Sequence, residues 1–192
     1  DPGHGGVDPG TIGVTGIYEK HIALSMSRAI REALGHFGIF QVKLTRDRDI
    51  FIPLRARIKI AREAGADLFI SVHADSIKKP NIRGASVYTL SERASDKEAA
   101  ALAEKENKAD LIADIDLAKY EDSTNDILID LSQREAMNQA AHFATILKGE
   151  LKQRIRLLRN THRSAGFAVL KAPDVPSVLL EVGFLSNVHD ER

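Results

Sequence analysis

Four polar residues, each at a position where a strand or helix is expected to begin or end, could together carry out metal-assisted chemistry. His4 lies in the glycine-rich segment Asp1–Gly6, Glu19 follows it by fifteen residues, and His73 comes at the end of an apolar run. Zinc sites that do chemistry typically take three protein ligands of this kind and keep a fourth position for water. Glu181 ends another apolar run, where a general base could sit. These residues predict a zinc hydrolase.

Each of these residues also has a purely structural interpretation when it is considered alone. A single histidine such as His4 is more often a satisfied structural residue than a metal ligand. A carboxylate such as Glu19 at the start of a helix also stabilises the helix dipole. His73 and Glu181 carry more weight, because ligands of open α/β sheets collect at the carboxyl ends of the strands. The four residues taken together favour the functional interpretation.

Composition limits the classes of protein to which the chain can belong. Its 192 residues suit one domain with a sizeable core. The 27 basic side chains balance 27 acidic ones, so net charge gives no reason to expect a nucleic-acid partner. No apolar run approaches the roughly 18–20 residues of a membrane span. Cysteine is absent, which excludes a disulfide scaffold and a cysteine-ligated zinc site.

Short apolar runs alternate with helical patterns along the chain. This alternation predicts a single α/β domain over residues 1–192, with a mostly parallel twisted sheet flanked by helices. The spacing of apolar residues predicts helices over 20–37, 53–64 and 127–155. Strands are expected over 40–45, 67–72, 84–90, 167–170 and 178–182.

Residues 91–125 interrupt this alternation and are predicted to form a helical insertion. A connection of this length within a compact domain is typical of a functional lid. The sequence Ser95-Asp96-Lys97-Glu98 is a capping box, which predicts that a helix begins there. Leu102 is the only large apolar residue between Ala99 and Lys108, so we expect this helix to bury little.

Seven segments, in order along nearly the whole chain, resemble the zinc-dependent amidase 3 family of N-acetylmuramoyl-L-alanine amidases, which are bacterial cell-wall hydrolases. They are Asp1–Gly6, Glu19–Lys20, Leu44–Arg46, Leu54–Arg57, Ser71–Asp75, Gly84–Tyr88 and Val178–Asn187. The helical insertion resembles that of the Gram-negative division amidases within this family. The resemblance implies a role in cell-wall splitting at division and a location in the periplasm.

The resemblance also implies roles for the four residues. His4, Glu19 and His73 match the family's ligands to one Zn²⁺, and Glu181 matches its catalytic glutamate. Zinc would lower the pKa of its bound water toward ~7 and polarise the scissile carbonyl. Glu181 would accept a proton from that water and later return one to the leaving amine. The bond cut would join N-acetylmuramic acid to L-alanine of the stem peptide in peptidoglycan.

In the division amidases, a helix in the insertion can cover the active site and place a glutamate against the zinc. Glu98, Glu104 and Glu106 are the candidates for this role, and we choose Glu106. Such a carboxylate would displace the nucleophilic water, and tethering gives it a high effective concentration. Alternatively, all three are solvated charges on an exposed helix. The resemblance further implies a LytM-type activator protein, for which the apolar patch Leu111–Ile115 is a candidate contact unless it packs on the domain.

Other interpretations stay open at this stage. A zinc peptidase that cuts within the stem peptide and a non-catalytic peptidoglycan-binding module would both fit the same residues. A phosphate-binding glycine loop is disfavoured, because no Lys, Ser or Thr directly follows the glycines. Asp1 and Asp75 could orient the neighbouring histidines or be capping or turn residues. His162 could line the substrate groove, and Arg46 could contact the substrate or support the loops. We expect a monomer.

Overall fold

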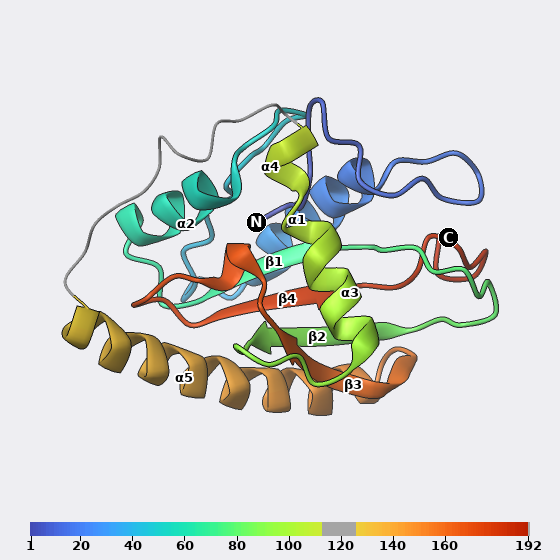
Figure 1. Ribbon diagram of the computed structural model, residues 1–192. Coiled ribbons are helices and arrows are strands. Elements are labelled where there is room, and N and C mark those ends of the chain that lie inside the picture. Colours follow the sequence, from blue (N-terminus) through green and yellow to red (C-terminus); the bar gives the residue numbers. More distant parts are fainter. Residues whose placement is uncertain (113–125, 192) are drawn as a thin grey trace.

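The computed structural model describes residues 1–112 and 126–191, which form an open sheet with helices packed against both faces (Figure 1). The strands are β1 (Phe69–His73), β2 (Ala85–Leu90), β3 (Leu157–Ala165) and β4 (Ser177–Glu181), in the spatial order β1-β4-β2-β3. The pairs β1–β4 and β2–β3 are parallel, whereas β2 and β4 are antiparallel. The predicted α/β class with a mostly parallel sheet is therefore confirmed.

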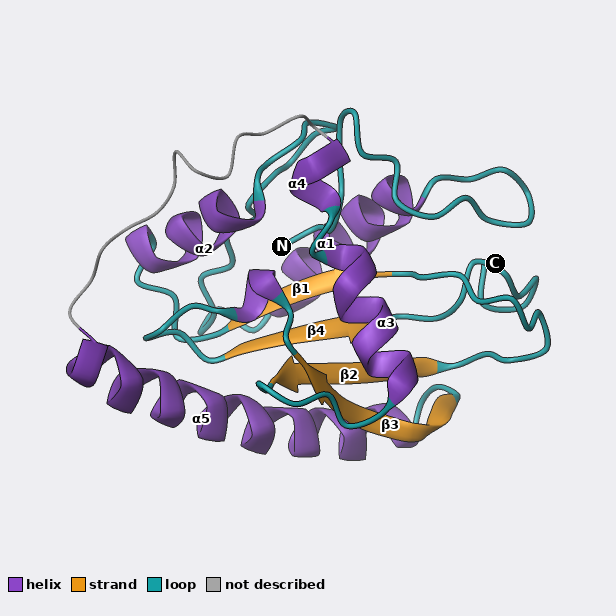
Figure 2. Ribbon diagram, in the orientation of Figure 1, coloured by secondary structure: helices purple, strands orange, loops and turns teal. Residues whose placement is uncertain are grey.

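Figure 2 shows the helices that surround this sheet. They are α1 (Glu19–Gly35), α2 (Leu54–Glu63), α3 (Lys97–Glu106), α4 (Ala109–Ile112), α5 (Asp126–Lys152) and a 3₁₀ turn, η2 (Ala168–Leu170). The three long helices predicted from apolar spacing are confirmed to within a few residues at each end. None of the helices in the described ranges combines the length and apolar composition that crossing a membrane requires.

Two apolar clusters cover opposite faces of the sheet. One contains Phe69, Tyr88 and Leu179 from the strands and packs beneath α2, α3 and η2. The other contains Val87 and Val178 and packs against α5, which is drawn below the strands in Figure 1. Side chains alternate between the two faces of a strand. Helices on both faces therefore bury every residue of β4.

The same alternation places two of the predicted site residues on the face that α3 covers. Phe69 in β1 and Leu179 in β4 belong to the cluster on that face. His73 is four residues after Phe69 and Glu181 is two after Leu179, so both point to the same face. His73 and Glu181 are also direct register partners in the parallel pair. Their side chains therefore emerge side by side at the carboxyl ends of the two central strands.

The start of the chain lies along the outer edge of β1. Pro2 forms a parallel bridge with Val72, the Gly3 amide donates to the Val72 carbonyl at 2.9 Å, and the Val72 amide donates to the Asp1 carbonyl at 2.8 Å. This pairing brings the glycine-rich segment up to the same end of the sheet as His73. Segments some seventy residues apart in sequence thus meet at one edge.

Several sequence-based expectations about individual elements are wrong. Residues 40–45 alternate in polarity but form no strand, and their side chains are exposed or half-buried. Residues 167–170 form no strand, and Ala168–Leu170 form the turn η2 instead, because Phe167, Val169 and Leu170 fill the apolar cluster beneath α2. The real strand is β3, directly before this turn, which has the weakly apolar sequence Leu-Leu-Arg-Asn-Thr-His-Arg-Ser-Ala.

A helix begins where the capping box predicts one, with two differences from expectation. Asp96, not Ser95, is the N-cap of α3, and its side chain accepts from the Ala99 amide at 2.9 Å. The helix also buries more than expected, since Ala99, Leu102 and Ala103 all belong to the apolar cluster on its face of the sheet. Small side chains let the helix approach the sheet closely. Residues 113–125 of the predicted insertion lie outside the described residues.

Leu179 should contribute strongly to stability, because it is fully buried in the central strand. We expect Leu179→Ala to lower the free energy of unfolding by about 2–5 kcal/mol. The same change at Leu131, which is 62% exposed on α5, should cost below about 0.5 kcal/mol. Urea denaturation followed by far-UV circular dichroism checks both values, and equal losses would contradict the assigned core.

Candidate active site

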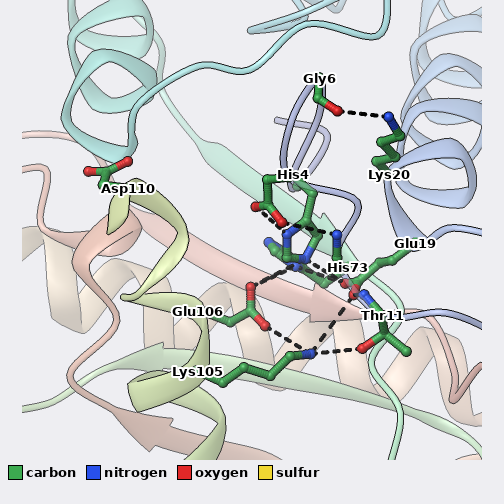
Figure 3. Close-up of polar contacts among 12 residues, drawn as sticks. His4, Gly6, Thr11, Glu19, Lys20, His73, Lys105, Glu106 and Asp110 are labelled. Carbon is green, nitrogen blue, oxygen red and sulfur yellow. Dashed lines mark hydrogen bonds and ion pairs between the residues drawn. The ribbon is translucent and has the colours of Figure 1, made fainter. Parts of the chain in front are cut away.

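Two imidazole nitrogens and two carboxylate oxygens meet at the carboxyl end of β1 (Figure 3). Glu19 Oε1 lies 3.1 Å from both His4 Nε2 and His73 Nδ1. Glu106 Oε2 lies 3.4 Å from the same atom of His4 and 3.3 Å from that of His73. His4, His73 and Glu106 together are a group that could hold a metal ion.

The histidine–carboxylate separations among these four atoms are close to those between donors around one zinc ion. Ligands bound about 2.0–2.1 Å from zinc in a tetrahedron lie about 3.3 Å from one another. The four separations between a histidine nitrogen and a carboxylate oxygen span 3.1–3.4 Å. His4 Nε2 is also fully buried and has no hydrogen-bond partner among the described residues. A buried nitrogen without a partner is costly unless a ligand binds it.

Asp8 fixes which nitrogen of His4 faces the other donors. Its Oδ2 lies 2.7 Å from His4 Nδ1, and its Oδ1 accepts from the Gly10 amide at 3.0 Å. A carboxylate at Nδ1 keeps the proton there and leaves the Nε2 lone pair free for a metal. Burial opposes protonation of His4, yet the carboxylates of Glu19, Asp8 and Glu106 raise its pKa to about 10. The same carboxylates would attract a cation placed between the two rings.

Glu19 is the first residue of α1 and is completely buried. Its Oε2 accepts from the Thr11 amide at 2.9 Å, and its Oε1 accepts from the Ala74 amide at 3.0 Å. Burial would raise the pKa of this carboxyl, but the charges of His4 and His73 and the contact with His73 Nδ1 hold the pKa well below its usual value. Glu19 is therefore an ionised, rigidly oriented carboxylate.

Two glycines are required for the close packing of the ligand candidates. A Cβ at Gly3 would lie 2.4–2.7 Å from atoms of the His73 ring. A Cβ at Gly10, where φ is +66°, would lie 2.6 Å from the His4 ring and 2.7 Å from the Glu19 side chain. Neither position can accept a side chain without displacing a candidate ligand.

Buried guanidinium groups hold the His4 segment in place. Arg57 Nη2 donates to the His4 carbonyl at 2.8 Å and Nη1 donates to the Pro2 carbonyl at 2.6 Å. Arg46 Nη2 donates to the Gly3 carbonyl at 2.7 Å. His4 itself has φ +57°, an uncommon conformation for a residue with a side chain, and these hydrogen bonds help to maintain it.

Glu181 lies beside His73 in the sheet and completes the set of buried carboxylates. Its Oε2 accepts from the Asp75 amide at 2.9 Å, whereas Oε1 is buried without a hydrogen-bond partner among the described residues. Burial, reinforced by the charges of Asp75, Glu19 and Glu106, raises the pKa of Glu181 well above its usual value. A carboxyl of this kind can both accept and donate a proton near neutral pH.

The end of α3 carries two charged residues into the site, as Figure 3 shows. Glu106 is 4% exposed, although its helical neighbour Glu104 lies at the surface. Lys105 Nζ is 2.5 Å from Asp75 Oδ1, 2.9 Å from Thr11 Oγ1 and 3.5 Å from Glu106 Oε1. These charges outweigh the effect of burial and raise the pKa of Lys105.

Further contacts dock the insertion on either side of these residues. The Asn107 side chain donates to the Gly166 carbonyl at 2.8 Å and accepts from the Ala168 amide at 2.7 Å. Asp110 accepts from the Leu54 amide at 2.9 Å, at the first turn of α2. Ser95 exchanges hydrogen bonds with the backbone of Ser164, which extends the pairing at the end of β3.

The structure brings together His4, Glu19, His73 and Glu106, with Glu181 in the adjacent strand, but gives other candidates different roles. Asp1 contacts Arg57, Thr45 and Ser71 and no histidine. Arg46 is buried and supports loops instead of facing a substrate. His162 lies on β3, where its Nε2 is 3.1 Å from Thr89 Oγ1.

Three contributing residues were not identified from the sequence. Asp8 is four residues from His4, and this spacing is the signal that the sequence offers for it. Gly10 follows a proline in the same loop. Lys105 looked like one of many charges on an exposed helix, and only the docking of α3 reveals its contacts.

The family model described as N-acetylmuramoyl-L-alanine amidase (Amidase_3) matches residues 1–192. The chain belongs to this family. It is 41% identical to the N-acetylmuramoyl-L-alanine amidase AmiA of Escherichia coli K12 over 193 residues, which cover 100% of this chain and 66% of that protein. It is 37% identical to AmiC of Neisseria meningitidis serogroup B over 100% of this chain and 46% of that protein. The chain thus spans between about half and two thirds of the length of these curated relatives.

Solved structures of amidases share the fold. The catalytic domain of CwlV from Bacillus (Paenibacillus) polymyxa var. colistinus is 26% identical with a TM-score of 0.58, covering 100% of this chain and 82% of that one. Ami1 of Mycobacterium smegmatis has a TM-score of 0.64 at 18% identity, covering 100% and 83% of the two chains, which is a likeness in fold alone. These comparisons confirm the family to which the sequence motifs point.

If the Asp8 carboxylate orients His4, its removal should weaken metal binding without unfolding the protein. We expect Asp8→Ala to reduce Zn²⁺ affinity about 10–100-fold. Asp8→Asn should retain part of it, because its amide oxygen can still accept from Nδ1. Competition with a chromogenic zinc chelator measures these affinities. Asp67→Asn, at an exposed site before β1, is the control, and a similar loss there would contradict the assignment.

Proposed function

We propose that this chain is a zinc-dependent N-acetylmuramoyl-L-alanine amidase that acts on peptidoglycan and is held inactive by α3. The observation that carries the proposal is the convergence of donors from His4, His73, Glu19 and Glu106, whose histidine–carboxylate separations are 3.1–3.4 Å, with the buried Glu181 in the adjacent strand. The bond to be cut follows from family membership and from the names of the curated relatives. The donors themselves support the broader class of metal hydrolase.

In the active state His4, Glu19 and His73 would hold one Zn²⁺. Bound zinc would supply a Lewis acid for the scissile carbonyl and a lowered pKa for the attacking water. Glu181 would take a proton from this water and transfer it to the nitrogen of the leaving amine. The raised pKa of Glu181 suits both steps, because the protonated and ionised forms are then closer in free energy at neutral pH.

Glu106 would occupy the fourth position and exclude the substrate and its attacking water. Its Oε2 is equidistant from the two imidazole nitrogens within 0.1 Å, as expected of a fourth ligand rather than a partner of one histidine. Glu106 is also the last residue of α3, where the helix dipole disfavours a negative charge. A cation at the site and Lys105 beside it would offset that cost.

The remaining parts of the proposal rest on family resemblance. They are a role in cell-wall splitting at division, a periplasmic location, activation by a LytM-type protein and a monomeric state. Leu111 and Ile112, at 61% and 55% exposed, are available for an activator to contact. Residues 113–115 of the same apolar patch lie outside the described residues.

The test is release of muropeptides from purified peptidoglycan by the zinc-loaded protein, with product analysis by mass spectrometry. We expect little release by the unaltered chain and at least about tenfold more by Glu106→Ala, because the fourth position becomes free for water. Glu104→Ala is a matched control, since Glu104 is on the same helix but pairs with Lys108 at the surface. It should remain as inactive as the unaltered chain.

Two further experiments separate the parts of the proposal. Glu106→Ala combined with Glu181→Gln should release nothing, because the proton acceptor is absent. Removal of zinc from Glu106→Ala should abolish release, and its return should restore it. Cleavage within the stem peptide would identify a peptidase instead. Zinc binding by a folded Glu106→Ala that releases no product would point to a binding module.

A further inference from the structure

The Lys105 ammonium group occupies a small polar site of its own beside the candidate metal position. It contacts Asp75 Oδ1 at 2.5 Å and Thr11 Oγ1 at 2.9 Å, and it is 4.0 Å from Glu19 Oε2. Thr11 Oγ1 in turn donates to Asp75 Oδ1 at 3.3 Å. Asp75 is only 8% exposed. When α3 is docked, this carboxylate and hydroxyl are thus occupied by a primary ammonium group from the same chain.

This ammonium site is contiguous with the reaction centre on two sides. Lys105 Nζ is 3.5 Å from Glu106 Oε1, while the other oxygen of Glu106 contacts the two histidines. The Asp75 backbone amide donates to Glu181 Oε2 at 2.9 Å, so the residue that binds the ammonium also holds the proposed proton donor. A nitrogen protonated by Glu181 would therefore emerge close to the Asp75 carboxylate.

Hydrolysis of an amide generates a group of this same kind. The carbon–nitrogen bond breaks, the oxygen of water adds to the acyl carbon, and both protons of the water end on the nitrogen. The products are a carboxylate and a primary ammonium group. For the proposed substrate, the ammonium is the freed α-amine of the peptide, which has the same charge and the same three donors as the end of a lysine.

We propose that Asp75 and Thr11 form the subsite that binds the amine side of the scissile bond as its ammonium product, and that Lys105 occupies this subsite when α3 is docked. The proposal rests on the function proposed above and adds a position for one product. The docked helix then occupies two adjacent positions, with Glu106 at the metal and Lys105 at the leaving group. Docking of α3 and binding of the amine product are consequently mutually exclusive.

The subsite is best tested by binding, because the Asp75 charge also acts on the pKa of Glu181 and a change in rate would be ambiguous. The probe is L-alanyl-D-isoglutamine, and its partner is the des-amino analogue propionyl-D-isoglutamine. Isothermal titration calorimetry on the zinc-loaded Lys105→Ala, Glu106→Ala double variant compares the two. We expect the free amine to bind about tenfold or more tightly than the des-amino analogue.

Substitutions in the same background assign the preference to the subsite. Asp75→Asn should remove most of it, and Thr11→Val should reduce it. Asp67→Asn, a matched change at the opposite end of β1, should leave it intact. The Glu106→Ala single variant should bind the amine more weakly than the double variant, because Lys105 still competes. Zinc content and thermal unfolding confirm that each variant is loaded and folded.

Three results would overturn the proposal. The first is equal binding of the two ligands, and the second is a preference for the amine that survives Asp75→Asn. The third is a preference that is lost when zinc is removed but not in Asp75→Asn, which would mean that the amine binds the metal. These outcomes are independent of catalysis. If the double variant shows the predicted preference but releases no muropeptides, the ammonium subsite stands and the proposed amidase activity fails.

Discussion

The accumulation of buried carboxylates at one end of the sheet is the constraint on which the rest of this structure depends. Glu19, Glu181 and Asp8 are each at most 1% exposed, and Glu106 is 4% exposed. Buried charges of one sign are costly unless positive charge is supplied nearby. The two imidazoles, together with a cation between them, would supply it on one side, and Lys105 supplies it on the other. Because Glu106 adds a further negative charge, closure of α3 should be more favourable with a metal present than without it. The contact that would inhibit the enzyme and the chemistry that it blocks would then depend on the same ion.

Different parts of the fold position the different donor side chains of this site. His73 and Glu181 need only the sheet, because parallel register places them side by side. His4 lies in a loop with glycines at positive φ on its carboxyl side, and such a loop leaves backbone carbonyls without ladder partners. Arg46 and Arg57 fill that need, since both are buried and donate to carbonyls of the first four residues. An arginine presents several donors in a fixed plane, so each guanidinium can fix more than one carbonyl. The precision of the His4 position is therefore a property of α2 and of the loop before it as much as of the glycine-rich segment.

The sequence predicts the parts of this arrangement that depend on local pattern. Amphipathic spacing identified α1, α2 and α5, and apolar runs identified β1, β2 and β4, so His73 and Glu181 could be placed at strand ends. The polarity pattern of a segment failed to predict its structure where pairing with another segment decides whether a strand forms. Residues 40–45 alternate in polarity but pair with no strand in the part of the chain that the structure describes. By contrast, β3 contains Arg159, Asn160 and Arg163 and still pairs with β2. Asp8 and Lys105 act through contacts across a turn and between distant elements, which spacing alone does not reveal. The same reason explains why Glu106 could be singled out only with the help of a family resemblance.

The composition of α3 suits the role proposed for it, a lid that would have to dock accurately and yet open. Burying one leucine side chain is worth about 1.5–3 kcal/mol, and Leu102 is the only large apolar residue that the helix buries. Ala99 and Ala103 allow close approach but add little apolar area. Specific position therefore comes from polar contacts at the two ends, with Asp96 and Ser95 at one and Lys105, Glu106 and Asn107 at the other. An activator that shifts such a lid from 1:99 open to 99:1 must favour the open state by about 5.5 kcal/mol. That amount is within reach of a modest protein contact, whereas a helix with several buried leucines would raise the requirement well above it. A small apolar contact combined with specific ionic anchors is thus consistent with a closed state that a partner can reverse.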